Sequence, residues 1–366
     1  MARTLPRAES TFDAIERVAQ AGLPAQQLLE EVGKRIDRVV PSDGYFIGAT
    51  DPDTTLCMGS GVVHDLPYEM CAPTWDYEFL VPDYLKFVEI ADSGRPVADL
   101  HEATGGRPER SARWREIGTP NGLGSEVRVV FTIGDSTWGI GQLNRASDTP
   151  RYSDDEKAWL ERVAPVVAAG LRKAMVIEPS TSPCDRGPGI VVLDVDGRPL
   201  SATREATAWL DDLDPTLTGA AMSEFPLPFE AHAYVAQVRA SAGDHGGSRV
   251  ARARLRTRTG VWLVMHGSML EGTDDVALVI EPAKANDIAP LIVEAYGLTQ
   301  REVDVTRAIS RGLGTAEIAT HLFVSQHTVR DHIKSVFEKV GVSSRGELVA
   351  KVFADYYSPV LTHVDY

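Results

Sequence analysis

The strongest constraint on this fold lies in residues 298–353, where signals that start and stop helices alternate at short intervals. Thr299 precedes Glu302 by one helical turn, so each side chain can accept a hydrogen bond from the other's backbone amide. Gly312 and Gly341 each follow an apolar periodic stretch and can take the positive φ that ends a helix. This segment is therefore restricted to short helices.

Four such helices are predicted, and each has one apolar stripe. The second spans Ala316–Leu322, and the turn Phe323-Val324 separates it from a third helix that Ser325 caps and that runs to about Val340. Ser344 is the cap predicted for the fourth. The stripes consist of Leu298, Val305, Ala308, Ile309, Ile318, Ala319, Leu322, Val329, Ile333, Val336, Phe337, Leu348, Val349, Val352 and Phe353.

The residue order of this segment is more specific than its helices. It reads Leu298-Thr299-x-Arg301-Glu302, Gly312-x-x-x-x-Glu317-Ile318-Ala319-x-x-Leu322, Val324-Ser325-x-x-Thr328-Val329-x-x-His332-Ile333, Lys339 and Gly341-Val342-x-x-Arg345. The order resembles the LuxR/GerE family of bacterial transcription regulators at almost every motif position. The resemblance implies an all-α, four-helix, helix-turn-helix DNA-binding domain at 291–357. It also implies dimerisation through the fourth helix, and RNA polymerase as a partner.

The third helix leaves one face free for DNA. A helix fits the major groove, where base edges carry a distinct donor and acceptor code. Arg330 and Lys334 are one turn apart on that face, so both can reach one groove, and Arg330 can bind guanine O6 and N7. Asp331 either accepts from cytosine N4 or pairs with Arg330 or Lys334. These three residues are the predicted base contacts.

Six further residues are predicted to contact phosphates, with the N-terminus of the third helix contributing. They are Ser325, His327, Thr328, His332, Lys339 and Arg345. The alternative for His332 is a structural role, and the alternative for Lys339 and Arg345 is that they only cap helix ends.

Charge divides the chain unevenly. Residues 296–357 hold eight Lys/Arg and seven Asp/Glu, a net charge of +1, and the remainder carries −16. A domain of charge +1 binds DNA weakly alone, whereas two copies on half-sites one helical turn apart double the contacts. We therefore expect a homodimer on an inverted-repeat operator in double-stranded DNA.

Residues 10–177 form the first of two blocks that precede this domain. Strands are predicted at 45–49, 55–63, 126–133 and 137–144, and a long helix begins at Ser153. The segments 84–91, 94–100, 122–131 and 137–139 resemble the GAF-like sensory domains of actinobacterial regulators.

The second block, residues 188–282, is similar to a PAS domain. A strand from Gly189, the turn Asp196-Gly197 and a second strand lead into a helix, and further strands are predicted at 248–258, 261–270 and 276–280. Linkers are predicted at 178–188 and 281–290. The whole chain is thus predicted to be multidomain α+β, with two antiparallel-sheet blocks before the helical domain.

Two clusters in these blocks leave their roles open. The spacing of Cys57, His64 and Cys71 matches no usual zinc pattern, so we expect Cys57 and Cys71 to be small apolar fillers, with metal ligation, haem or redox sensing as alternatives. Arg252, Arg254, Arg256 and Arg258 alternate along a strand, with Arg249 before them. This stripe is predicted to be a solvated or interdomain face, and binding to an anion or to the DNA backbone is the alternative.

The remaining signatures are negative. No motif of an enzyme, an ATPase or a phosphoacceptor receiver is present, so we expect no catalysis, cofactor or metal. The spacing of the aromatic residues in the first block does not match that of an acyl-homoserine-lactone-binding domain. The N-terminus lacks an apolar targeting core, and no run is long enough for a membrane span, so a cytoplasmic location is expected.

We therefore predict a sequence-specific transcription regulator, of activator type by family analogy, whose front blocks respond to a small molecule or other signal. The alternatives are a constitutive DNA binder whose front blocks bind a partner protein, and a redox or haem sensor.

Overall fold

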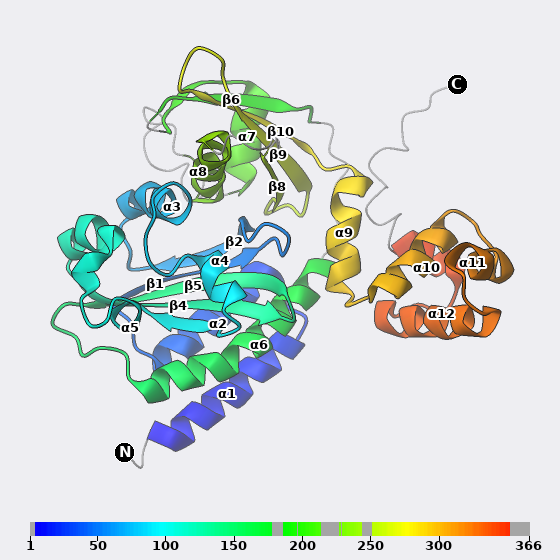
Figure 1. Cartoon of the computed structure of the whole chain (residues 1–366), viewed down its shortest axis with the longest axis horizontal. Helices are drawn as coiled ribbons and strands as arrows, with labels where there is room; N and C mark the ends of the chain where they lie inside the picture. The colour runs from blue at the N-terminus through cyan, green and yellow to red at the C-terminus, as the bar shows by residue number, and fades with distance from the viewer. Residues whose placement is uncertain are drawn as a thin grey trace.

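A computed structural model describes residues 4–177, 186–195, 197–213, 227, 229–243 and 251–351. Figure 1 shows three parts: a sheet with helices at the N-terminal end, a second sheet above it, and a helical unit to one side. Two antiparallel five-stranded sheets and a helical C-terminal part confirm the predicted α+β class. Among the residues that the structure describes, no helix is long and apolar enough to cross a membrane.

The first sheet has the order β2-β1-β5-β4-β3. Its strands are β1 (Gly44–Thr50), β2 (Cys57–His64), β3 (Val97–Asp99), β4 (Leu123–Ile133) and β5 (Ser136–Ala146). Three helices cover one face: α1 (Thr4–Gln20), α2 (Ala25–Val39) and α6 (Asp154–Ile177) (Figure 1). Apolar side chains of α2 and α6 such as Leu29 and Val163 are fully buried against the sheet.

Short elements cover the other face of this sheet. They are η1 (Tyr68–Met70), α3 (Cys71–Phe79), α4 (Phe87–Asp92), α5 (Leu100–Ala103), η2 (Pro108–Arg110), the π-helical η3 (Trp114–Gly118) and η4 (Thr119–Asn121). Beneath them β4 presents Glu126 and Arg128 where an apolar side chain would be expected in a core. This face therefore has a polar interior.

The second sheet has the order β7-β6-β10-β9-β8. Its strands are β6 (Gly189–Leu193), β7 (Pro199–Ala202), β8 (Ala251–Arg256), β9 (Trp262–Met269) and β10 (Val276–Pro282). The helices α7 (Arg204–Leu213) and α8 (Phe229–Gly243) pack on it. The predicted stripe of Ala206, Trp209, Leu210 and Leu213 is buried, as expected for the inner face of α7. Asp196 and Arg249 lie outside the described residues.

The two sheets are joined by the arginine stripe. Arg254 donates through Nε and Nη2 to the two carboxylate oxygens of Asp51, each at 2.6 Å, and also contacts Asp53. Arg254 and Asp51 are both buried. A Cβ at Gly59 would lie 2.5 Å from the Arg256 carbonyl oxygen, so the strands approach too closely there for a side chain. The stripe is thus an interdomain face at these positions.

The linker predicted at 281–290 is wrong, because β10 continues to Pro282 and α9 (Ala285–Ala295) follows it. The Asp287 carboxylate accepts from the Lys284 amide at 2.7 Å and starts the helix. Ile288, Leu291 and Ile292 then pack into the core of the first block. Burial of this apolar face outweighs the backbone hydrogen bond lost at the internal Pro290.

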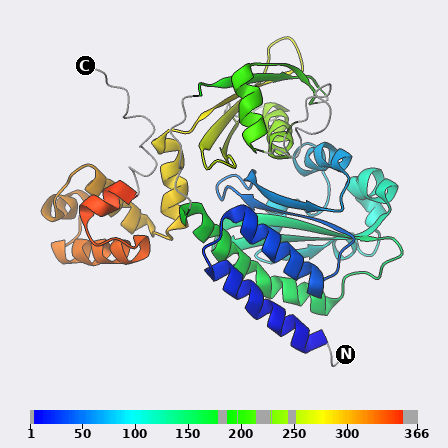
Figure 2. The ribbon, with the colours of Figure 1, turned by 180° about the vertical axis from the view of Figure 1, so that it is seen from behind.

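The helical unit follows α9 directly. It contains α10 (Gln300–Ser310), α11 (Thr315–Leu322), α12 (Gln326–Val340) and α13 (Arg345–Val349). Figures 1 and 2 show it beyond α9, away from both sheets. Its core consists of Val305, Ala308, Ile309, Ile318, Ala319, Val329, Val336, Val340 and Leu348. Val352 and Phe353 of the predicted stripes lie outside the described residues.

Candidate nucleic-acid interface

Local sequence determines where the helices of this unit begin and end. The Thr299 hydroxyl accepts from the Glu302 amide at 3.3 Å, and the Glu302 carboxylate accepts from the Thr299 amide at 2.7 Å. Ser325 caps α12 by accepting from the Thr328 amide at 3.0 Å. Gly341 ends α12 with a φ of 70°. The predicted caps and stops are thus confirmed.

The turn between α11 and α12 is tight. Phe323 takes a left-handed conformation, with a φ of 54°, and its side chain is 94% exposed. Its neighbour Val324 turns inward and packs on the core of the unit. The Val324 amide donates to the Ala319 carbonyl at 3.0 Å, which closes the turn. The result is a helix-turn-helix in which α12 is the second helix.

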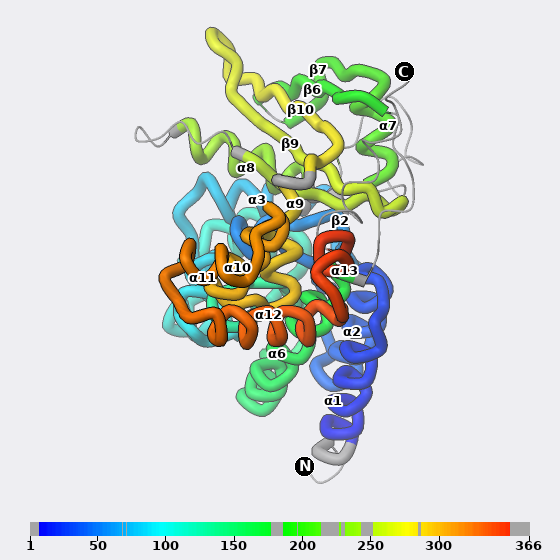
Figure 3. Tube along the Cα trace, turned by 90° about the vertical axis from the view of Figure 1, so that its right-hand side faces the viewer, coloured from blue at the N-terminus to red at the C-terminus, as the bar shows by residue number. Residues whose placement is uncertain are grey.

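The outer face of α12 carries the predicted base contacts. Arg330, Asp331 and Lys334 are all exposed, and the opposite face buries Val329 and Val336. Figure 3 shows α12 along the lower edge of the unit, with α10 and α11 above it. The helix therefore presents a continuous polar face along its length.

Two long polar contacts between side chains lie on this face. His327 Nε2 is 3.8 Å from Asp331 Oδ2, and Lys334 Nζ is 3.9 Å from Glu338 Oε1. Asp331 thus contacts His327, and not Arg330 or Lys334 as one prediction had it. Exposed pairs of this kind contribute little to stability, so a phosphate or a base can displace them readily.

The predicted phosphate contacts divide into two groups. Ser325, His327 and Thr328 lie at the exposed N-terminus of α12, where the helix dipole favours an anion. His332 is half-buried. Lys339 and Arg345 are instead bound within the unit. Arg345 donates through Nη1 to the Leu313 carbonyl and through Nη2 to the Thr315 hydroxyl, each at 2.8 Å.

Glu302 is the polar centre of the unit, a role that the sequence did not reveal beyond its cap. Lys339 Nζ lies 2.7 Å from Glu302 Oε2, and the Ser335 hydroxyl donates to Oε1 at 2.6 Å. Burial alone would raise the pKa of Glu302, but hydrogen bonds from Lys339, Ser335 and Thr299 lower it to about 2. Glu302 therefore fixes α12 against α10 as a buried carboxylate.

We expect Glu302→Gln to lower the stability of the helical unit by about 2 kcal/mol at pH 7. Because the folded-state pKa lies below the unfolded one, this contribution is present at neutral pH and is lost as the pH falls from about 5 toward 2. Native-state hydrogen exchange of the α10 and α12 amides measures it. Glu338→Gln, which removes an exposed carboxylate from α12, should change protection by less than about 0.5 kcal/mol. Equal losses of amide protection in both variants would contradict the role of Glu302 as the polar centre of the unit.

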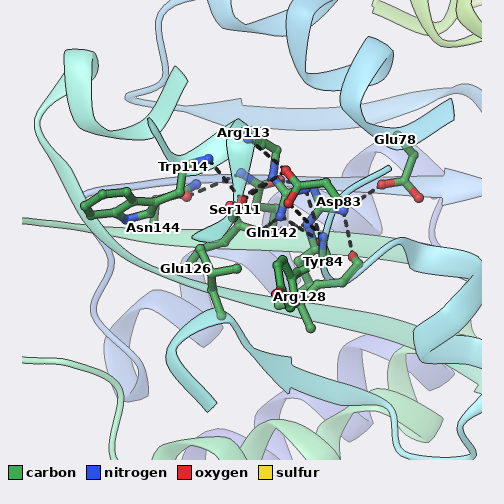
Figure 4. A network of polar contacts seen from close by, with 12 residues as sticks. Glu78, Asp83, Tyr84, Ser111, Arg113, Trp114, Glu126, Arg128, Gln142 and Asn144 are labelled. Carbon is green, nitrogen blue, oxygen red and sulfur yellow. Dashed lines mark hydrogen bonds and ion pairs between the residues drawn. The ribbon is translucent and has the colours of Figure 1, made fainter. Parts of the chain in front are cut away.

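A second polar centre lies in the first block, between β4 and the short elements that cover it (Figure 4). Arg128 Nη1 donates to Glu78 Oε2 at 2.6 Å, and its Nε donates to Glu126 Oε1 at 2.9 Å. Arg113 Nη2 donates to the same Glu126 oxygen at 2.7 Å. Asp83 accepts from the Arg113 amide at 2.7 Å. The side chains of the two arginines and of their three carboxylate partners are each at most 8% exposed, so the network is shielded from water.

The cysteine and histidine cluster does not assemble. Cys57 is buried at the start of β2, and His64 lies at its other end, half exposed and 3.3 Å from Asp65. A strand of this length separates its ends by roughly 20 Å, so Cys57 and His64 cannot bind the same metal ion. The side chain of Cys71 lies outside the described residues. Among the residues that the structure describes, no three His, Cys, Asp or Glu side chains could hold a metal ion together.

Comparison with known proteins places the similarity in the helical unit. Residues 297–352 match the family model for bacterial regulatory proteins, luxR family. The spore germination protein GerE of Bacillus subtilis is 40% identical over 55 residues, which cover 15% of this chain and 74% of that protein. An HTH-type transcriptional regulator of Mycobacterium bovis is 48% identical over 52 residues, or 14% of this chain. The chain spans only 6% of the length of that relative.

Among solved structures, the GAF domain from a phosphoenolpyruvate-protein phosphotransferase of Coxiella burnetii aligns with a TM-score of 0.29 and 14% identity. The alignment covers 46% of this chain and 93% of that chain. The GAF-like and PAS-like assignments of the two front blocks stay predictions.

Proposed function

The chain belongs to the LuxR family of bacterial regulatory proteins, and from this premise we propose that it is a sequence-specific regulator of transcription that reads double-stranded DNA with α12. The observation that carries the proposal is the exposed face of α12, which holds Arg330, Asp331 and Lys334 on a helix whose other face is anchored in a core. A helix held in this way can enter the major groove without unfolding any part of the unit.

The side chains of α12 have different tasks in this proposal. Arg330 binds guanine O6 and N7, Lys334 reads the same edge, and Asp331 accepts from cytosine N4 once it leaves His327. Ser325, His327 and Thr328 contact phosphates and fix the register. Lys339 and Arg345 act from within the unit, because their side chains hold α12 and α13 against α10 and α11.

Two copies are needed for tight binding. The helical unit carries a small net charge, and a single recognition helix makes few phosphate contacts, so one copy binds weakly. We propose a homodimer on an inverted repeat, formed through α13. Activation through RNA polymerase, and control by a signal that the front blocks receive, complete the proposal.

Selection from a pool of random-sequence duplexes by the full-length protein tests this function. The expected result is an enriched inverted repeat whose half-sites are centred about 10 base pairs apart, with a G·C pair at the position that Arg330 reads. A pool that remains random after several rounds would contradict sequence-specific DNA binding. An enriched site without two-fold symmetry would contradict the dimer.

A further inference from the structure

Three polar atoms in the first block converge on one small cavity next to the buried ion network. They are Trp114 Nε1, Ser125 Oγ and Asn144 Nδ2, and none has a hydrogen-bond partner within the part of the chain that the structure describes. Ser125 is 3% exposed and Asn144 1% exposed. Buried polar groups are almost always hydrogen-bonded, so this cavity is built to receive a partner from outside the chain.

The network fixes what Asn144 offers to the cavity. The Arg128 guanidinium can only donate, so Gln142 turns its Oε1 toward Arg128, at 3.0 Å. Gln142 Nε2 then donates to Asn144 Oδ1 at 3.3 Å. Asn144 therefore keeps its NH₂ group free of Gln142, and both this group and Trp114 Nε1 belong to residues that line the cavity. Glu126 also lines the cavity, but its carboxylate already accepts from Arg113 and Arg128, so the groups left without a partner are mainly donors.

Charge excludes an ionic occupant. The carboxylates of Glu78, Asp83 and Glu126 face the two guanidinium groups of Arg113 and Arg128, a formal charge of −1. A bound anion would increase this buried negative charge, which is costly at low dielectric. A cation would find each of these carboxylates already bonded to an arginine. A neutral acceptor is the partner that fits.

An aromatic pocket adjoins the donors. Phe46, Trp75 and Phe87 line it, and Met70 and Thr74 form a wall common to both cavities. The rings of Phe46 and Trp75 meet edge to face with centroids 6.3 Å apart. Aromatic walls of this kind favour a planar ring as occupant.

We propose that the first block binds a small, uncharged heteroaromatic molecule, whose ring-nitrogen or carbonyl acceptors bond to Trp114, Ser125 and Asn144 and whose ring lies in the aromatic pocket. Trp114 begins the π-helical η3, and π-helical turns often mark functional sites. The inference names the ligand class for the proposed sensory role. The binding of this ligand does not depend on the proposed function, and only its effect on DNA binding rests on that proposal.

The occupant has to displace Met70. The cavity beside the donors measures about 10 Å³, room for roughly one water molecule, and the aromatic pocket about 40 Å³. Met70 forms part of the wall between them, and a methionine side chain adapts to a new neighbour more easily than a branched one. The proposal therefore requires this side chain to rotate so that the two spaces join.

Three compounds of similar size test the proposal on the full-length protein without DNA. Nicotinamide offers a ring nitrogen and a carbonyl, nicotinate replaces the amide with a carboxylate, and toluene has no acceptor. With ¹⁵N-labelled tryptophan, we expect nicotinamide to shift the Trp114 indole N–H signal downfield at millimolar concentration, and to bind at least about tenfold tighter than either control compound. The Trp209 signal, from the second block, should stay in place and report an intact fold.

Variants then distinguish the loss of a hydrogen-bond donor from a disturbance of the fold. Trp114→Phe keeps the ring and removes one donor, and it should weaken nicotinamide binding about tenfold, as followed by the Trp75 signal. Asn144→Ala should act similarly, whereas Trp209→Phe should leave the affinity unchanged. No shift with nicotinamide would overturn the proposal and leave the donors around a single water. Nicotinate binding as tightly as nicotinamide would overturn the neutral class. Neither result would affect the DNA-binding proposal, which is tested separately.

Discussion

Replacing Arg128 with methionine should lower the free energy of unfolding of the first block by about 3–5 kcal/mol, because removing one partner of a buried ion pair leaves the other uncompensated. Arg128 is fully buried and bonds to both Glu78 and Glu126, so the variant leaves two carboxylates with one cation fewer. Urea denaturation of the full-length protein, followed by tryptophan fluorescence, to which the first block contributes four of the six tryptophans, measures the loss.

Arg95→Met is the matched control. Arg95 pairs with Glu161 at 3.3 Å, but its side chain is 74% exposed, so the loss should stay below about 1 kcal/mol. Glu126 keeps its ion pair with Arg113, so adding Glu78→Gln to Arg128→Met removes the carboxylate that the variant leaves without its arginine and should restore part of the stability. Equal effects of Arg95→Met and Arg128→Met, or no recovery in the double variant, would show that the network is not the polar core described above.

The second large effect is expected at the DNA interface. Arg330→Ala and Lys334→Ala should each weaken binding to the selected operator by about 1–3 kcal/mol, or roughly 5- to 150-fold. If Arg330 reads a guanine, its loss also relaxes specificity at that one position, and affinity for random DNA changes far less. Fluorescence anisotropy with the operator, and with variants of it at each base pair, measures both quantities at fixed salt.

Lys173→Ala provides the comparison for charge alone. It removes one positive charge from the exposed side of α6, outside the helical unit, and should leave operator affinity within about twofold. An operator affinity unchanged in both Arg330→Ala and Lys334→Ala would reject α12 as the reading helix. A uniform loss on operator and random DNA would assign both side chains to phosphates.

Local signals made the helical unit predictable. Thr299, Glu302, Ser325 and Gly341 act through neighbours one helical turn away, so their effect on helix ends is encoded within a few residues. The exposure of Arg330 also follows from helical period alone. By contrast, the partners of Lys339 and Arg345 come from other helices, and their contacts depend on how the helices pack.

The sequence was least informative where distant segments decide the structure. Residues 281–290 contain two prolines and predicted a linker, but the core of the first block offers a surface on which Ile288 and Leu291 become buried. Glu126 and Arg128 alternate with buried valines on β4, a pattern typical of a strand with one face in water. Here α3 and α4 cover that face, and nothing within β4 itself indicates the cover.

The packing of the segment that leads into the helical unit has a consequence for operator choice. Leu291 and Ile292 fix α9 to the first block, and Tyr296 packs on both that core and the core of the helical unit. A flexible linker would let the two helical units of a dimer sample many separations. A stiff linker gives the second unit a high effective concentration at one half-site separation and almost none at others. Half-sites moved apart by about five base pairs would face opposite sides of the duplex. In a dimer, the fixed separation of the two α12 helices would prevent both from binding such half-sites at once, whatever the base sequence of the half-sites.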